Sequence, residues 1–215
     1  MCFLPTNYLT MANDATDWGD AETIFRYHKR LIDQYGAGTT RAQGWRSFDG
    51  QRARFDVLCQ IANLSGHSVL DAGCGHADLF PFLTKRFSSL TYYGCEQIPD
   101  LLDVAIQRYR RASQVTLLPG DFLADTVPMT DFVLASGSLN YRHSDARFIY
   151  KAIETLFDNC RIGLGFNLLS GGVEAGNLLQ TYDPEDISSF CERLAKSVTL
   201  RTGYWPDDFT LFLYK

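Results

Sequence analysis

The stretch VLDAGCGHAD, from Val69 to Asp78, decides the fold. It begins as a short apolar strand that ends in an acid, Asp71, and continues into a turn with Gly73 and Gly75 ahead of a helical segment. Glycine lets a backbone turn tightly and approach a ligand that a β-carbon would repel, and the next helix start offers unpaired amides. The stretch therefore predicts a ligand-binding loop between a strand and a helix.

Strand and helix patterns alternate on the C-terminal side of this loop. The expected strands are 69–71, 91–95, 115–118, 131–135, 162–168, 198–201 and 209–214, and the expected helices between them are 78–87, 99–111, 146–160 and 184–196. Asp183 before Pro184 is a strong helix start. Alternation of this kind indicates parallel strands joined by helical crossovers, whereas the last two strands are too close in sequence for a crossover. The prediction is a doubly wound α/β fold with a seven-stranded, mostly parallel sheet and an antiparallel last strand.

Two helical patterns precede the first strand, over 20–35 and 51–64, and Ser47 or Asp49 is the candidate N-cap of the second. We expect a flexible tail over 1–19, an N-terminal helical extension over 20–64 and a core over 65–215, all in a single domain. The extension is additional to the sheet and is a candidate lid.

Composition narrows the classes of partner. The 215 residues carry a net charge of −5, which disfavours a nucleic-acid partner. The six cysteines include no C-x-x-C pair, which indicates reduced thiols, and there is no apolar run of membrane-spanning length. The sequence therefore predicts a cytoplasmic protein without a membrane partner, and no metal site is expected.

Two kinds of ligand loop place glycines between a strand and a helix. A dinucleotide loop of the form G-x-G-x-x-G would need glycine where Asp78 stands. An acid before the first glycine also suits a cationic ligand better than a pyrophosphate. A nicotinamide dinucleotide oxidoreductase stays open as the less favoured alternative.

The stretch resembles motif I of the class I S-adenosylmethionine-dependent methyltransferases, which has an apolar pair, an acid and then G-x-G-x-G. Ala77 stands where the third glycine is common. The resemblance covers roughly 51–215 and implies the class I methyltransferase fold, S-adenosylmethionine as cofactor and methyl transfer as the activity. It also accounts for the final hairpin.

The resemblance extends to the ends of the next three strands. It implies that Glu96 binds the ribose hydroxyls, that Asp121 and Phe122 hold the adenine, and that the loop from Ser136 borders the methyl donor. Arg54 in the extension is a candidate partner for the cofactor's carboxylate. The residues expected to bind the cofactor are Asp71, Gly73, Cys74, Gly75, Glu96, Gln97, Asp121, Phe122, Ser136, Gly137 and Arg54.

A sulfonium methyl group is already electrophilic, so the expected mechanism is direct in-line transfer with at most one general base. The candidate catalytic residues are Asn140, Tyr141 and His143, with His143 the best base by its ordinary pKa. The aromatic and polar lid and wall candidates are Tyr27, His28, Tyr35, Trp45, Gln51, Asn167 and Trp205. The apolar character of these walls predicts a small, partly apolar acceptor. Methylation of a protein or RNA, and a non-catalytic module that binds S-adenosylmethionine, remain alternatives.

Overall fold

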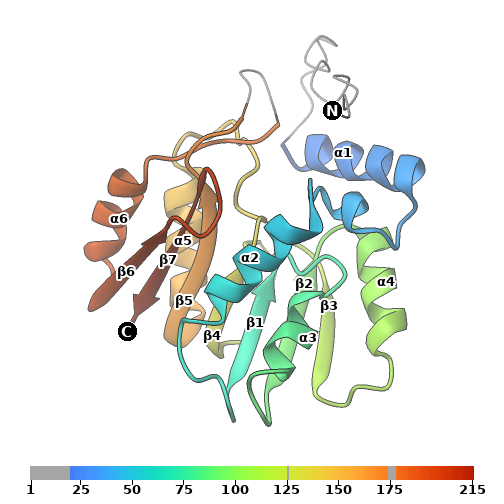
Figure 1. The fold of residues 1–215 in the computed structure, drawn as a ribbon, viewed down its shortest axis with the longest axis horizontal. Helices are drawn as coiled ribbons and strands as arrows, with labels where there is room; N and C mark the ends of the chain where they lie inside the picture. The colour runs from blue at the N-terminus through green and yellow to red at the C-terminus, as the bar shows by residue number, and fades with distance from the viewer. Residues whose placement is uncertain (1–19, 125, 174–177) are drawn as a thin grey trace.

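The structure, a computed structural model, describes residues 20–124, 126–173 and 178–215, so the predicted tail over 1–19 lies outside the described residues. Figure 1 shows the order of the elements along the chain. They are α1 (Asp20–Tyr35), η1 (Thr40–Gln43), α2 (Phe48–Leu58), β1 (Ser68–Ala72), α3 (Leu79–Thr84), β2 (Thr91–Glu96), α4 (Pro99–Tyr109), β3 (Val115–Pro119), β4 (Thr130–Ala135), α5 (Phe148–Asp158), β5 (Cys160–Leu169), α6 (Pro184–Glu192), β6 (Ser197–Thr202) and β7 (Asp208–Tyr214).

The seven strands form one sheet in the order β3-β2-β1-β4-β5-β7-β6. Strands β1 to β5 pair in parallel, and β7 lies antiparallel between β5 and β6. The predicted fold class, including the antiparallel last strand, is confirmed. The chain moves outward from β1 in one direction and then restarts at β4 in the other, which opens a crevice at the carboxyl ends of β1 and β4.

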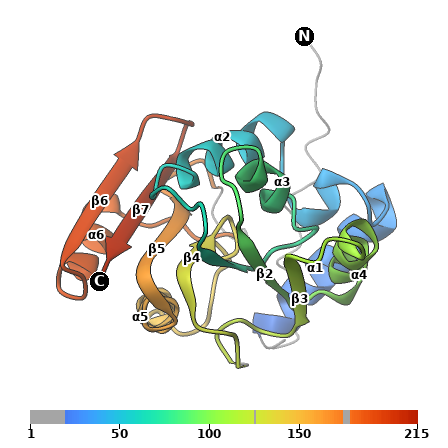
Figure 2. The same ribbon diagram turned by 90° about the horizontal axis from the view of Figure 1, so that it is seen from below.

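Helices cover both faces of the sheet, as Figure 2 shows from below. On one face α2, α3 and α4 enclose a core that includes Val69 and Leu134. On the other face α5 and α6 enclose a core that includes Leu70 and Val133. Successive residues of β1 and β4 thus enter opposite cores, which explains why these strands are apolar throughout instead of alternating.

The N-terminal extension lies across the carboxyl edge of the sheet, and in Figure 1 α1 is seen above α4 at that edge. A small cluster joins the two parts: Ile32 of α1 and Ala42 of η1 pack against Ile98 and Leu101 at the start of α4. The extension therefore covers the crevice at the switch between β1 and β4.

Helix starts were predicted better than helix ends. Ser47 caps α2 by accepting from the Gly50 amide at 3.0 Å, and Asp183 caps α6 by accepting from the Glu185 amide at 2.8 Å. The predicted ends at 64, 87, 111, 160 and 196 are wrong, because α2 to α6 end at Leu58, Thr84, Tyr109, Asp158 and Glu192. After α2 the chain continues in tighter turns with i to i+3 hydrogen bonds, which keep a helical spacing of apolar residues without an α-helix.

Among the described residues, none of the helices combines the length and the apolar character that crossing a bilayer requires.

Candidate active site

A cavity of about 280 Å³ lies at the carboxyl edge of the sheet, between the strand ends and the N-terminal extension. Every residue predicted to bind the cofactor or to act in catalysis lines it, as do the lid and wall candidates Tyr27, His28, Trp45, Gln51 and Trp205. Among these candidates only Tyr35 and Asn167 lie outside its wall. The fold thus brings together groups that are spread over most of the sequence.

The glycine loop, residues 73–78, follows β1 and forms one wall of the cavity. Gly73 has a φ of +77°, and a β-carbon there would overlap the Cβ atom of Ser138. Ala77, at the usual place of a third glycine, is also left-handed with a φ of +57°, a conformation that costs a non-glycine residue roughly 1–2 kcal/mol. The loop has the left-handed turn of the glycine pattern even though one glycine is replaced.

Asp71 is the residue before the last of β1 and is only 3% exposed. Its Oδ2 atom accepts a hydrogen bond from the Tyr92 hydroxyl at 2.5 Å. Burial raises the pKa of Asp71 to about 7, although the Tyr92 hydroxyl stabilises the charged form. The carboxyl group is therefore able to gain or lose its charge near neutral pH.

Glu96 ends β2 and is held in place by two backbone amides. Its Oε2 atom accepts from the Gly75 amide at 2.7 Å and its Oε1 atom from the Ile98 amide at 2.8 Å. Burial raises the pKa of Glu96, and these amides oppose the rise. Each oxygen has further lone pairs, so the carboxylate can accept two more hydrogen bonds from a ligand in the cavity.

The ends of β3 and β4 complete the wall. Asp121 accepts from the Leu123 amide at 2.9 Å, and Phe122 lies beside it, buried against the glycine loop. After β4, the Ser138 hydroxyl donates to the Ala72 carbonyl at 2.6 Å and so ties this loop to the end of β1. The acidic and aromatic pair predicted after β3 therefore lies in the same cavity as Asp71 and Glu96.

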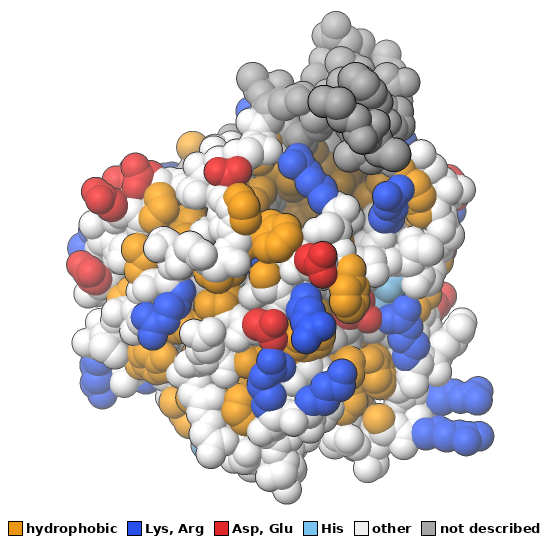
Figure 3. Space-filling view, viewed as in Figure 1, with side chains coloured by type: hydrophobic (Ala, Val, Ile, Leu, Met, Phe, Trp, Pro, Cys, Tyr) orange, Lys and Arg blue, Asp and Glu red, His pale blue; other side chains and the backbone are white. Residues whose placement is uncertain are grey.

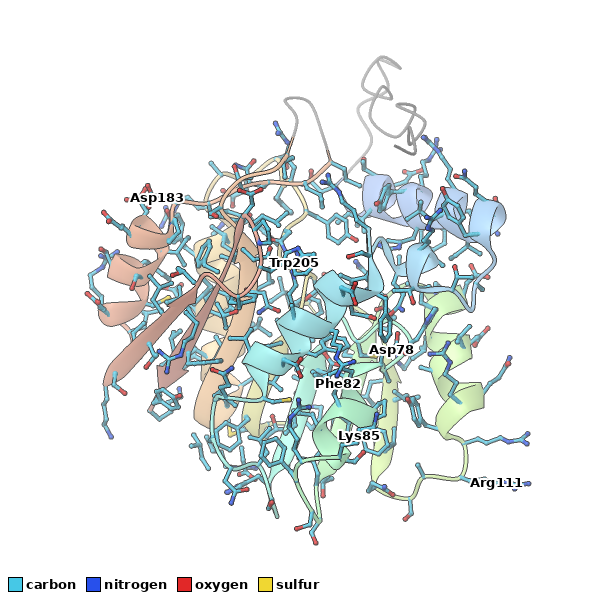
Figure 4. The ribbon with its side chains drawn as sticks, viewed as in Figure 1. Asp78, Phe82, Lys85, Arg111, Asp183 and Trp205 are labelled. Carbon is cyan, nitrogen blue, oxygen red and sulfur yellow. The ribbon has the colours of Figure 1, made fainter. Side chains whose placement is uncertain are left out.

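Gln43 of η1 fastens the N-terminal extension to the glycine loop, and sequence reasoning missed it. Its Oε1 atom accepts from the His76 amide at 3.0 Å, and its Nε2 atom donates to Asp78 at 2.8 Å. Arg108 of α4 binds the other oxygen of Asp78 at 2.7 Å. Figure 4 labels Asp78 at the start of α3, beneath the extension. The sequence did hold a signal for the short helix that carries Gln43, because Thr39 and Gly44 cap η1 at its two ends.

Arg54, predicted as a partner of the cofactor's carboxylate, is paired within the protein. Its Nη2 atom donates to Oδ1 of Asp208 at 2.7 Å, its Nε atom lies 2.6 Å from Oδ2, and its guanidinium group lies over the Trp45 ring. Asp208 begins β7, and Trp205 in the preceding loop packs beside Gly50 of α2 (Figure 4). The last hairpin and the extension therefore meet at the cavity.

All three candidate catalytic residues make contacts within the protein. The Asn140 carboxamide oxygen accepts from the Leu169 amide at 2.9 Å. The His143 ring stacks on Phe148 with centroids 4.1 Å apart, and its Nδ1 atom lies 3.1 Å from a carboxylate oxygen of Asp20. Tyr141, the third, is within hydrogen-bond distance of His28, with 2.7 Å between Oη and Nε2.

The prediction that Asn167 faces the acceptor is wrong. Its side chain is fully buried below the cavity wall, where its oxygen accepts from the Ser136 hydroxyl at 2.9 Å and its nitrogen donates to Thr210 at 2.6 Å. The apolar run of β5 could not reveal that a neighbouring strand offers a polar partner.

The comparisons with known proteins agree with this geometry. No protein-family profile matches the sequence. The chain is 27% identical over 159 residues to "Putative methyltransferase Rv1506c" of Mycobacterium tuberculosis, covering 69% of this chain and 93% of that protein. Its fold is similar to magnesium protoporphyrin IX methyltransferase from Synechocystis with bound S-adenosylhomocysteine, with a TM-score of 0.69, 16% identity and 90% and 99% of the two chains covered. It is also similar to 1,6-didemethyltoxoflavin-N1-methyltransferase of Burkholderia thailandensis, with a TM-score of 0.66, 14% identity and 94% and 92% covered.

The cavity fits an S-adenosyl ligand in its own right. The glycine loop leaves room for close approach, Glu96 presents a fixed carboxylate, and Phe122 lies beside the acid after β3. The sheet order and the likeness to solved methyltransferases show the class I methyltransferase fold, and the motifs at four strand ends resemble those of S-adenosylmethionine-dependent enzymes of that fold. The fold implied by the sequence is confirmed. Solved structures of magnesium protoporphyrin IX methyltransferase hold S-adenosylmethionine or S-adenosylhomocysteine, which is consistent with the cofactor that the sequence implies.

Proposed function

We propose that this protein transfers a methyl group from S-adenosylmethionine to a small, partly apolar acceptor by direct in-line displacement. The proposal rests on one observation: residues from the ends of four parallel strands line one cavity, which the N-terminal extension covers. These residues are Asp71, Glu96, Asp121 and Ser136. Parallel sheets of this type bind their ligands at that edge.

The chain's own residues would hold the cofactor along this wall. Glu96 accepts hydrogen bonds from the ribose hydroxyls, Asp121 accepts from the adenine amino group, and Phe122 packs on the adenine ring. Asp71 and the glycine loop take the amino-acid end, where a carboxylate favours an ammonium group. When bound, the cofactor supplies an electrophilic methyl group on a sulfonium.

The protein's contribution to the reaction is to align the acceptor and exclude water. The N-terminal extension suits that role, because its Trp45 packs on the loop after β4. The Trp45 ring lies 3.2 Å from where a β-carbon of Gly137 would be. Closing the extension over the strand ends would fix both reactants and keep water out.

The lining of the cavity supports a small acceptor with an apolar surface. Tyr27, Trp45, Phe148 and Trp205 contribute aromatic rings to the wall. On the face seen in Figure 3, basic and acidic side chains are interspersed with hydrophobic ones instead of forming one basic stripe. Two structural neighbours are named for small ring compounds, magnesium protoporphyrin IX and 1,6-didemethyltoxoflavin, which adds support.

Labelled S-adenosylmethionine incubated with the protein and a fractionated cell extract tests the proposal. We expect the label in a small-molecule fraction, and label only in protein or RNA would contradict the small acceptor. Thermal unfolding provides a second measurement: S-adenosylhomocysteine at one hundred times its Kd should add about 2.7 kcal/mol of stability, and NAD should add none. Stabilisation by NAD alone would overturn the proposal.

A further inference from the structure

A tyrosine and a histidine from distant parts of the chain form a polar pair in the cavity wall. Tyr141 follows β4, and His28 lies in the middle of α1 in the N-terminal extension. The Tyr141 hydroxyl is 2.7 Å from Nε2 of His28, and both residues line the cavity. The pair therefore exists only when the extension is docked on the core.

The second ring nitrogen of His28 determines where the protons are. Its Nδ1 atom lies 3.0 Å from the Ala42 carbonyl oxygen, which can only accept, so Nδ1 carries a proton. In the neutral ring Nε2 then has a free lone pair and accepts the Tyr141 hydroxyl hydrogen. The Tyr141 oxygen keeps its own lone pairs for another donor.

The surroundings keep both groups neutral at pH 7. His28 is 4% exposed, and burial lowers the pKa of its ring. Burial, with Tyr27 and Glu96 nearby, raises the pKa of Tyr141 well above its ordinary value. Burial also raises the pKa of Tyr27, and the charge of Arg46 opposes that rise. A neutral imidazole behind a neutral hydroxyl is the arrangement of a base that acts through a relay.

Gly44 lies beside the pair. It has a φ of +84°, and a β-carbon there would lie 3.4 Å from the Tyr27 hydroxyl oxygen and 3.7 Å from that of Tyr141. Two phenol oxygens thus approach the backbone between η1 and α2, in the wall of the cavity. His143, the other candidate base, is already engaged with Phe148 and Asp20.

We propose that Tyr141 and His28 relay the proton that the acceptor loses during methyl transfer. The acceptor's O–H or N–H bond breaks and its proton goes to the Tyr141 oxygen, while the Tyr141 hydroxyl proton goes to Nε2 of His28. The freed electron pair on the acceptor forms the new bond to the methyl group, the carbon–sulfur bond breaks, and S-adenosylhomocysteine leaves. His28 then returns its proton to water through the relay.

This inference rests on the proposed function and narrows its substrate. The acceptor atom must carry a proton that it loses during transfer, as in a hydroxyl or an N–H group, which excludes tertiary amines and thioethers. Tyr141 is the catalytic residue in this scheme, and His28 is a positioning residue that acts through it.

Nitrogen-15 NMR of the full chain with S-adenosylhomocysteine bound tests the proton assignment without any acceptor. We expect His28 to be neutral at pH 7, protonated at Nδ1 and bare at Nε2. A charged ring, or a neutral ring protonated at Nε2, would overturn the relay.

Single-turnover methylation of the labelled small-molecule fraction tests the chemistry. His28→Gln keeps a hydrogen-bond acceptor for Tyr141 but has no basicity, and Tyr141→Phe removes the hydroxyl. We expect each to slow transfer by about 10²–10⁴-fold with the Kd for S-adenosylhomocysteine unchanged. The wild-type rate should fall as His28 becomes protonated at low pH, and His28→Gln should lack that fall.

His67→Gln is the matched control, because His67 pairs with Asp131 at the opposite edge of the sheet, away from the cavity. It should behave as the wild type. If wild type labels nothing, the proposed function fails and the relay with it. If wild type and His28→Gln give the same rate and pH profile, the relay alone is refuted.

Discussion

Asp71 shows how strongly the pKa of one carboxyl group can depend on the fold. It is enclosed at the end of β1 with Tyr92 as its hydrogen-bond donor, and burial raises its pKa to about 7. In the unfolded chain an aspartate has a pKa near 3.9. Between these two values the folded protein holds a proton that the unfolded chain releases.

This difference predicts that folding stability falls as pH rises from about 4 to about 7, by at most about 4 kcal/mol for this group. Asp71→Asn, which can still accept from Tyr92, should remove that part of the pH dependence. Urea unfolding of the unliganded protein at pH 5 and pH 8 measures it. The variant should gain stability relative to wild type at pH 8, and parallel losses in both proteins would contradict the burial argument.

Glu96→Gln should weaken binding of S-adenosylhomocysteine by about 10- to 100-fold, because hydrogen bonds to a charged group contribute about 1.5–3 kcal/mol. The amide also cannot accept from both Gly75 and Ile98 through two oxygens. Isothermal calorimetry measures the Kd. Glu154→Gln, an exposed change on α5, serves as the control, and an equal Kd for both variants would discredit the site.

Sequence reasoning identified the residues at the strand ends because a parallel sheet brings all its carboxyl ends to one edge. Asp71, Glu96 and Asp121 could be placed together for that reason and from the resemblance of their motifs. The pairing of Arg54 with Asp208 could not, because 154 residues separate the partners and no local pattern joins them. The role of His28 was hidden in the same way, since its partner is 113 residues away.

At the scale of elements, the short 3-10 helix η1 holds the N-terminal extension against the glycine loop. It carries Gln43, which accepts from the His76 amide in the glycine loop and donates to Asp78. The sequence predicted neither η1 nor the true ends of α2 to α6, because short turns share the apolar spacing of α-helices while making different hydrogen bonds. The strands were placed more closely, since each predicted strand differs from the observed one by at most two residues at either end.

Gln43→Ala should loosen the N-terminal extension. It leaves the His76 amide without its partner, at a cost of about 1 kcal/mol, which corresponds to about a five-fold weaker Kd for S-adenosylhomocysteine. Hydrogen exchange of residues 20–44 should become faster. Gln60→Ala, at an exposed position just after α2, is the control, and unchanged exchange in Gln43→Ala would show that other contacts hold the extension.

At the scale of the whole molecule, segments from both halves of the chain close the cavity. Arg54 of the extension and Asp208 of the last strand form an ion pair whose side chains are 14% and 0% exposed. Burial raises the pKa of Asp208, and the Arg54 guanidinium opposes that rise. A carboxylate this deeply buried keeps its charge at a tolerable cost in stability only while its counter-ion is present.

Arg54→Met should therefore destabilise the protein by about 3–5 kcal/mol, because it leaves the Asp208 carboxylate buried without its counter-ion. Asp208→Asn should also destabilise it. The double variant should lose less than the two single losses added together, and urea unfolding of all four proteins gives the coupling energy. Strict additivity would mean that the pair is not coupled.

The N-terminal extension that covers the cavity has a consequence for the protein's lifetime in a cell. A ligand that binds only the closed state stabilises it in proportion to the logarithm of its concentration. Cells short of methyl donor would then hold more of this protein with its N-terminal segment detached and accessible to proteases. Abundance would follow the supply of donor without any dedicated regulator.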